Sequence, residues 1–188
     1  MQLAEETQRG LIVGINGQAE FIQGALDEGI DGFNENGMLK YAMGKLALLG
    51  DHDVLNDISS GDVVEIFDSE HRQIYRSYSC FSLSNYSLLE LATYPWFDLY
   101  ERSNKVEGEV INYSNSVLNG EASYVLMSEY IKEYTIRERR TKERAVFALQ
   151  EKFLKRMRSA VTKQNFCLSV KTVRELAQFS EDQEIKYI

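Results

Sequence analysis

The 188-residue sequence is poor in the residues that most often carry catalysis or cross-linking. It has two histidines, two cysteines and one proline. The phosphate-binding G-x-x-x-x-G-K motif, the metalloprotease H-E-x-x-H motif and the G-x-S-x-G nucleophile motif are all missing. No apolar run approaches the roughly 20 residues that a membrane-spanning helix requires. We therefore expect no catalytic residue, no metal site and no membrane partner, and the sequence points to no particular cofactor.

Cysteine usage and the N-terminal residues bear on the cellular compartment. Cys80 and Cys167 stand far apart in unrelated contexts, so reduced thiols are a simpler expectation than a disulfide. The first ten residues, MQLAEETQRG, are polar and acidic, whereas a signal peptide needs a basic start and an apolar run. These features predict a cytoplasmic protein.

Charge is distributed unevenly along the chain. The net charge is -8, but residues 135–164 carry ten Lys/Arg against three Glu, a net of +7, which leaves -15 for the remainder. An acidic body argues against nucleic-acid binding, and a basic helix over 137–163 is the only candidate for it. We favour the interpretation that these cations are the solvated face of that helix.

The N-terminal third has one open assignment and one clear helix. Asn16-Gly17 separates two apolar runs within 11–22, which favours a β-hairpin, while one amphipathic helix through the same residues is the alternative. Apolar spacing predicts a helix over Met38–Leu49, which Gly50 would end. A second hairpin is expected from 63–67, with its turn over 68–71.

The stretch 73–102 holds the chain's only tryptophan and its only proline. Alternation of Ile74, Tyr78 and Cys80 with serines predicts a half-buried strand that continues from the second hairpin. Ser87 followed three residues later by Glu90 indicates a capping box at a helix start. Pro95 then prevents that helix from continuing.

The C-terminal half is expected to be mostly helical. A helix over 103–118 would close at Asn119-Gly120, and residues 122–136 fit either a strand or a helix. A helix over 145–161 has apolar spacing close to a heptad seam, and a short helix is expected over 170–179. The seam would form a dimer or partner interface through Val146, Leu149, Phe153 and Met157, or the helix would pack on its own domain.

Several of these segments together resemble PAS sensory domains. The matching residues are Ile74-Tyr75, then NYSLLEL at 85–91, then PWFDL at 95–99, and the resemblance covers about 62–151. It implies an α+β fold with an antiparallel sheet of about five strands and flanking helices. Residues 1–137 would form this domain, with an N-terminal hairpin and helix, and 138–188 would be a helical extension towards an output module.

The PAS resemblance implies a non-enzymatic sensory or regulatory domain that acts through protein contacts, as a homodimer or with another partner. A small ligand would occupy the PAS pocket, and we place Cys80, Tyr86, Trp96 and Tyr124 around it. One alternative is an adaptor of a small GTPase, because the order hairpin, helix, hairpin is similar to Roadblock/longin proteins. A second alternative is an enzyme with an unfamiliar site at Asp51, His52 and Asp53, a carboxylate-flanked imidazole.

Overall fold

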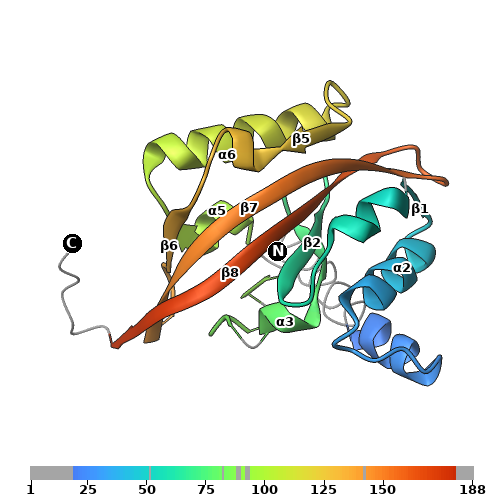
Figure 1. Ribbon diagram of the computed structural model, residues 1–188, viewed down its shortest axis with the longest axis horizontal. Coiled ribbons are helices and arrows are strands. Elements are labelled where there is room, and N and C mark those ends of the chain that lie inside the picture. Colours follow the sequence, from blue (N-terminus) through green and yellow to red (C-terminus); the bar gives the residue numbers. More distant parts are fainter. Residues whose placement is uncertain are drawn as a thin grey trace, which may run out of the picture.

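The computed structural model describes residues 19–50, 52–81, 83–87, 90–91, 94–141 and 143–180. Within these ranges the chain forms one curled antiparallel sheet with helices packed against it (Figure 1). The main strand order is β3-β2-β8-β7-β6-β4, and β1 and β5 also pair with β7. The predicted α+β class with an antiparallel sheet is confirmed, and the described residues contain eight strands rather than about five.

The bounds of the elements are as follows. The strands are β1 (Leu48–Leu49), β2 (Asp62–Phe67), β3 (Gln73–Arg76), β4 (Tyr100–Glu101), β5 (Tyr124–Leu126), β6 (Tyr134–Glu138), β7 (Glu143–Ser159) and β8 (Asn165–Ser180). The α-helices are residues 19–27, α2 (Glu35–Lys45), α3 (Tyr78–Phe81), α5 (Trp96–Leu99) and α6 (Asn104–Leu118). Residues 90–91 are also α-helical, and there are two 3₁₀ turns among the described residues, η1 (His52–Asp57) and η2 (Met127–Glu129).

The two longest strands form a hairpin at the centre of the sheet. β7 and β8 cross the whole molecule side by side, with 17 and 16 residues respectively (Figure 1). The helices predicted over 145–161 and 170–179 are therefore wrong, and the predicted helical extension over 138–188 is a pair of strands over 143–180, the part of it that forms β7 and β8. Residues 143–180 pair with β2, β5 and β6 and belong to the same sheet as the rest of the fold.

The helical seam predicted in this region is wrong for the same reason. Val146, Leu149, Phe153 and Met157 all lie in β7. Leu149, Phe153 and Met157 are buried in the core, and Val146 is half-buried. These side chains pack within the domain itself, as the second alternative had it, although they do so from a strand and not from a helix.

A β-bulge explains why β7 has helical spacing in its sequence. The register between β7 and β8 shifts between Glu151 and Phe153. Leu149, before the bulge, packs in the cluster beside α6, whereas Phe153 and Met157, after it, pack in the cluster beside α2. A strand that is covered on both faces and changes its alternation at a bulge places apolar residues three and four positions apart, as a helix does.

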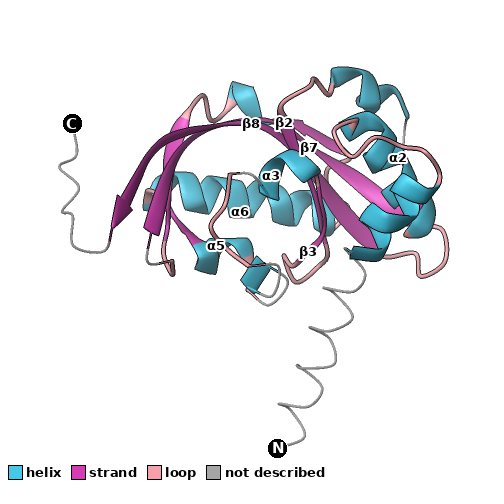
Figure 2. Ribbon diagram, turned by 90° about the horizontal axis from the view of Figure 1, so that it is seen from below, coloured by secondary structure: helices cyan, strands magenta, loops and turns pink. Residues whose placement is uncertain are grey.

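The sheet separates two apolar clusters. α6 lies on one side of β7 and β8, and α2 lies on the other (Figure 1); Figure 2 shows α5 and α6 beside the sheet. Leu99 and Phe147 are in the first cluster, and Leu39 and Met157 are in the second. Because β2 and β8 also contribute to both clusters, the central strands are buried on both faces, which is unusual for an antiparallel sheet.

In the N-terminal half, the structure agrees with some of the elements that local sequence patterns predicted and differs from others. The hairpin of β2 and β3 is confirmed, with Ile66 opposite Tyr75. Residues 19–22, the second half of the other predicted hairpin, are helical, and residues 11–18 lie outside the described residues. α2 ends at Lys45 rather than at Gly50, because Ala47 turns the chain at a φ of 50° into β1.

The stretch that follows β3 departs from the predicted strand. β3 ends at Arg76, and Tyr78–Phe81 forms the short helix α3, so the alternation of Tyr78 and Cys80 does not continue the strand.

The capping box is confirmed: the Ser87 N–H donates to Glu90 Oε2 at 2.8 Å, and the Glu90 N–H donates to Ser87 Oγ at 3.3 Å. Pro95 caps the N-terminus of α5. Residues 122–136 contain β5, η2 and β6, so the strand alternative is the better one there.

The basic stretch 137–163 lies in β6, β7 and the turn after β7, and it is not a helix. Lys152 Nζ donates to Asp62 at 2.6 Å, and Arg137 forms an ion pair with Glu101. Arg156 Nη1 donates to the carbonyl oxygen of Gly120 at 2.7 Å. Carboxylates elsewhere in the chain therefore neutralise part of this positive charge through individual ion pairs. The continuous basic helix, which was the only candidate for nucleic-acid binding, is not formed.

Helix α6 is bounded as its sequence predicts. Ser103 Oγ accepts from the Val106 N–H at 3.4 Å at the start, and the Asn119 N–H donates to the Asn115 carbonyl oxygen at 2.8 Å at the end. Gly120 then takes a φ of 85°, a conformation that favours glycine. The predicted helix and its glycine stop are confirmed.

Two glycines of this segment should respond oppositely to alanine. We expect Gly120→Ala to lower the free energy of unfolding by about 1 kcal/mol, because alanine is strained at positive φ. Its Cβ would also lie 3.2 Å from Arg156 Nη1 and from Asn165 Nδ2. Gly108→Ala, within α6 and facing open space, should raise it by about 0.5–1 kcal/mol. Urea denaturation measures both, and effects of the same sign would contradict this assignment.

Candidate functional site

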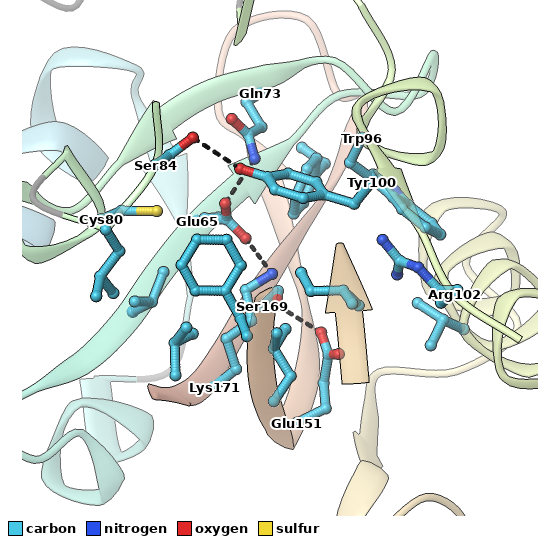
Figure 3. Close-up of a pocket in the computed structure, with 18 of the residues that line it drawn as sticks. Glu65, Gln73, Cys80, Ser84, Trp96, Tyr100, Arg102, Glu151, Ser169 and Lys171 are labelled. Carbon is cyan, nitrogen blue, oxygen red and sulfur yellow. Dashed lines mark hydrogen bonds and ion pairs between the residues drawn. The ribbon is translucent and has the colours of Figure 1, made fainter. Parts of the chain in front are cut away.

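A cavity of about 50 Å³ lies between the sheet and the segment that carries α3, α5 and α6. It has room for roughly three to five water molecules. Its walls are largely apolar side chains: Val63, Phe67, Leu83, Trp96, Val110, Ile136, Phe147, Leu149, Leu154 and Val173. Polar side chains from several elements meet in the same space (Figure 3): Glu65, Gln73, Cys80, Ser84, Tyr100, Arg102, Glu151, Ser169 and Lys171. Ser114, on α6, also lines it.

Glu65, in the middle of β2, is the most heavily bonded of these groups. It accepts from Gln73 Nε2 at 2.5 Å, lies 3.2 Å from Arg76 Nη2, and forms an ion pair with Lys171. The side chains of Glu65 and Arg76 are only 3% and 4% exposed. Although burial opposes ionisation, the Lys171 and Arg76 cations hold the pKa of Glu65 below its usual value. Glu65 is therefore a carboxylate at neutral pH.

Glu151 and Lys171 face each other across the β7–β8 pair, next to the bulge. Glu151 accepts hydrogen bonds from Tyr134 Oη at 2.7 Å and from Ser169 Oγ at 2.9 Å. Burial lowers the pKa of Lys171, but the neighbouring Glu65 and Glu151 carboxylates more than offset this and raise it overall. Burial, followed by the nearby Glu151, raises the pKa of Tyr134 well above its usual value. Lys171 is thus a cation and Tyr134 a neutral hydroxyl at neutral pH.

Arg102 completes the polar lining from the short segment between β4 and α6. Its guanidinium stacks on the Trp96 ring at 4.2 Å from the ring centroid and lies 6.0 Å from that of Tyr134. Figure 3 shows this guanidinium directed towards the interior of the cavity. Arg102 Nε is buried and has no hydrogen-bond partner among the described residues. The aromatic rings hold the cation in place, but they do not give its Nε–H a hydrogen-bond acceptor.

The four ligand-binding residues predicted from the sequence fall into two groups. Cys80, on α3, and Trp96, at the start of α5, line the cavity. Burial raises the pKa of Cys80 to about 11, so it is a neutral thiol. Tyr86 does not line the cavity: its hydroxyl donates to the Leu99 carbonyl oxygen in the core. Tyr124, on β5, is 41% exposed and stacks on Phe153, away from the cavity.

Sequence reasoning missed the charged members of the site. Glu65 and Lys171 each interrupt an apolar strand segment, VVEIF and SVKTV, and this interruption is a signal that a buried charge is present. Gln73, Arg102 and Glu151 have no comparable signal, since each stands in a polar stretch of the chain. The fold brings all five together from β2, β3, the β4–α6 connection, β7 and β8.

The second predicted site, at 51–53, gains no support from the described residues. His52 and Asp53 begin the 3₁₀ turn η1, while Asp51 and the side chain of His52 lie outside what the structure describes. Among the described residues, no group of three or more His, Cys, Asp or Glu side chains could hold a metal ion. In the same residues, no helix has both the length and the apolar character that are needed to cross a membrane.

Comparisons with known proteins find similarity in structure but none in sequence. No protein-family model and no curated protein matches the chain. A PAS domain from a two-component sensor histidine kinase aligns with 73% of this chain and 97% of its own, at 12% identity and a TM-score of 0.39. The PAS domain of a protein from Colwellia psychrerythraea aligns with 74% and 97%, at 13% identity and a TM-score of 0.36. PAS domains are thus among the solved structures to which this chain is similar, as its sequence predicted.

Proposed function

We propose that this chain is a non-enzymatic sensory domain that binds a small molecule in the cavity and signals through contacts with another protein. The observation that carries the proposal is the convergence of Glu65, Gln73, Arg102, Glu151 and Lys171 on one apolar-walled space. Binding sites for small molecules characteristically combine apolar walls with a few placed polar groups. Buried charges are costly, and apolar residues would often stabilise a core equally well, so a role beyond stability accounts for them best.

The position of the cavity suggests how binding could reach a partner. Glu151 and Lys171 are register partners at the point where β7 bulges against β8. A bulge is a local break in the hydrogen-bond ladder, so this part of the hairpin can adjust more easily than a regular one. We propose that occupancy of the cavity shifts the bulge and thereby the far ends of β7 and β8, where a partner would respond.

Location and assembly complete the proposal. We assign the domain to the cytoplasm because Cys80 and Cys167 are both buried and free. A homodimer, or another protein partner, remains part of the proposal, and light scattering of the purified protein measures it directly. The GTPase-adaptor alternative loses support, because residues 19–22 are helical where its first hairpin needed a strand.

Native mass spectrometry tests ligand binding directly. We expect the protein, purified from cells, to carry extra mass that denaturation removes. Ser114→Leu should abolish it, because Ser114 lies on α6 in the cavity wall and a larger apolar side chain there fills the space. Asn112→Leu is the matched control, since Asn112 is exposed on the same helix. Extra mass that survives in Ser114→Leu, or none on the unmodified protein, would contradict binding in the cavity.

A further inference from the structure

One end of the molecule carries two segments of opposite charge. Residues 20–35, from the first helix to the start of α2, contain five Asp/Glu (20, 27, 28, 31 and 35) and no Lys/Arg; we call them the acidic patch. Residues 155–163, the end of β7 and the turn after it, contain four Lys/Arg (155, 156, 158 and 163) and no Asp/Glu; we call them the basic turn. Figure 1 shows α2, with the blue segment before it, and the β1 end of β7 at the same end of the molecule, away from the C-terminus.

The basic turn is held by its own hydrogen bonds and exposes a valine. The hydroxyl of the buried Ser159 accepts from the Val161 N–H at 3.2 Å and from the Thr162 N–H at 3.1 Å. Val161 is 75% exposed, and Arg158 and Lys163 are exposed as well. Arg158 Nε donates to the carbonyl oxygen of Lys163 at 3.2 Å, so these two residues lie together. A turn that is fixed in this way loses little conformational entropy when it binds.

The acidic patch lies beside an exposed aromatic pair. The Phe33 and Tyr78 rings meet edge-on with their centroids 4.9 Å apart, and the two side chains are 72% and 39% exposed. Asp31 Oδ1 accepts from the Phe33 N–H at 3.0 Å, which places this carboxylate next to the pair. Asp27, at the end of the first helix, is also exposed. Exposed aromatic rings next to carboxylates suit an apolar side chain that is accompanied by a cation.

The acidic patch and the basic turn are placed so that two copies of the chain can pair them. Asp31, Arg158 and Lys163 form no ion pair with any described residue. The acidic patch leads into the N-terminus of α2, whereas the basic turn contacts the segment after its C-terminus: the Ala160 N–H donates to the Ala47 carbonyl oxygen at 2.7 Å. The 11 residues of α2 separate the two by about 16 Å. A twofold axis that sets two α2 helices antiparallel therefore brings each acidic patch to the basic turn of the other copy.

We propose that this end of the molecule is the interface of a homodimer. In it, the Phe33–Tyr78 pair of each copy receives Val161 of the other copy, and Asp31 faces Lys163 of the other copy. This inference rests on the proposed function, because it names the surface of the homodimer and places it at an end of β7 that the bulge would move. Since a twofold interface repeats every contact, one substitution removes two contacts.

Analytical ultracentrifugation over a range of protein and salt concentrations measures the dimer. We expect a dimer that weakens as the salt concentration rises, because the paired charges lie at the surface. Val161→Ser should weaken it by roughly tenfold or more, since the apolar contact is lost in both halves of the interface. Leu176→Ser is the matched control, because Leu176 is 49% exposed on β8, outside both segments. This variant should dimerise as the unmodified protein does.

An exchange of charges tests the contact itself. Asp31→Lys and Lys163→Glu should each lose the dimer, because like charges then meet in both halves of the interface. An equimolar mixture of these two variants should form a heterodimer, since opposite charges then meet in each half. Asp31 also accepts from the Phe33 N–H, so circular dichroism of each variant establishes that it is folded before the dimers are compared.

The outcomes separate this inference from the proposal beneath it. An unmodified protein that stays monomeric, a dimer that Val161→Ser leaves intact, or a mixture of the folded charge variants that does not associate overturns this interface. If it is overturned while Ser114→Leu still removes extra native mass, ligand binding in the cavity stands. A dimer with the expected response, in a protein without extra native mass, overturns ligand binding and leaves the interface standing.

Discussion

Replacement of Glu65 by alanine is expected to lower the free energy of unfolding by about 3–5 kcal/mol, the usual cost of breaking a buried ion pair by removing one partner. The change leaves Arg76 and Lys171 without the carboxylate that both of them contact. Their side chains are only 4% and 15% exposed, so water cannot replace the lost partner well. Urea denaturation followed by fluorescence of Trp96, the only tryptophan in the chain, gives the measurement.

The pH dependence of stability provides a second test of Glu65. Its pKa in the folded protein lies below the usual value, so its stabilising contribution is complete above the unfolded pKa of about 4.3 and is lost as the pH falls through the lower, folded value. The unmodified protein should therefore lose stability more steeply than Glu65→Gln in acid. Identical acid profiles for the two proteins would show that Glu65 is not held as an ion.

A matched control shows whether the stability lost in Glu65→Ala comes from the burial of this carboxylate or from the loss of any carboxylate. Glu133→Ala removes a side chain that is 62% exposed and 4.0 Å from Arg174. We expect a change within about 0.5 kcal/mol, because exposed ion pairs contribute little. A comparable loss in Glu133→Ala and Glu65→Ala would contradict the assignment of a special role to the buried group.

Replacement of Glu138 by alanine is expected to cost about 3 kcal/mol or more, because several donors lose their acceptor at once. Glu138, at the end of β6, is fully buried. It accepts from the Asn85 N–H at 2.9 Å, from Thr141 Oγ1 at 2.7 Å and from Ser84 Oγ at 3.2 Å. These hydrogen bonds join the loop before the capping box to the β6–β7 turn, so the loss should also loosen one wall of the cavity.

A conservative variant, Glu138→Gln, provides a comparison for the stability loss expected in Glu138→Ala. Glu138→Gln keeps one oxygen acceptor for the Asn85 N–H and should lose less stability than Glu138→Ala. Both are measured by urea denaturation with Glu133→Ala as the exposed reference. A loss below about 1 kcal/mol for Glu138→Ala would mean that water or other groups satisfy the donors, contrary to this structure.

The parts of the fold that could be predicted from the sequence are those with local causes. The β2–β3 hairpin, the Ser87–Glu90 capping box and the glycine stop of α6 each follow from a few neighbouring residues. Turns and caps are set by backbone dihedrals and nearby hydrogen bonds, so a short window of sequence contains the information. Not every local signal was reliable: residues 19–22 are helical where Asn16-Gly17 favoured a hairpin, and α2 ends at Lys45, before Gly50.

The central hairpin and the charged site could not be predicted in the same way. The bulge between Glu151 and Phe153 exists only against β8, and it gave β7 an apolar period that resembles a helix. Glu138 stands in RERR, a run that reads as solvent-exposed, although the structure buries it completely. Arg102 gains its role from Trp96 and Tyr134, which only the folded chain brings beside it. Each of these depends on pairing between distant segments.

The placement of β8 has a consequence for how the protein folds. This strand pairs on one side with β7 and on the other with β2, where Asp62 lies opposite Thr172 across more than half of the chain. During synthesis, β2 and β7 leave the ribosome before β8. The edge of β2 that pairs with β8 in the folded protein therefore has no partner until β8 emerges. Such high contact order is associated with folding times of milliseconds to seconds and with transient exposure to aggregation. The centre of this sheet is therefore the last part of it to form. Until β8 has been synthesised, the unpaired edge of β2 is exposed to aggregation with other chains.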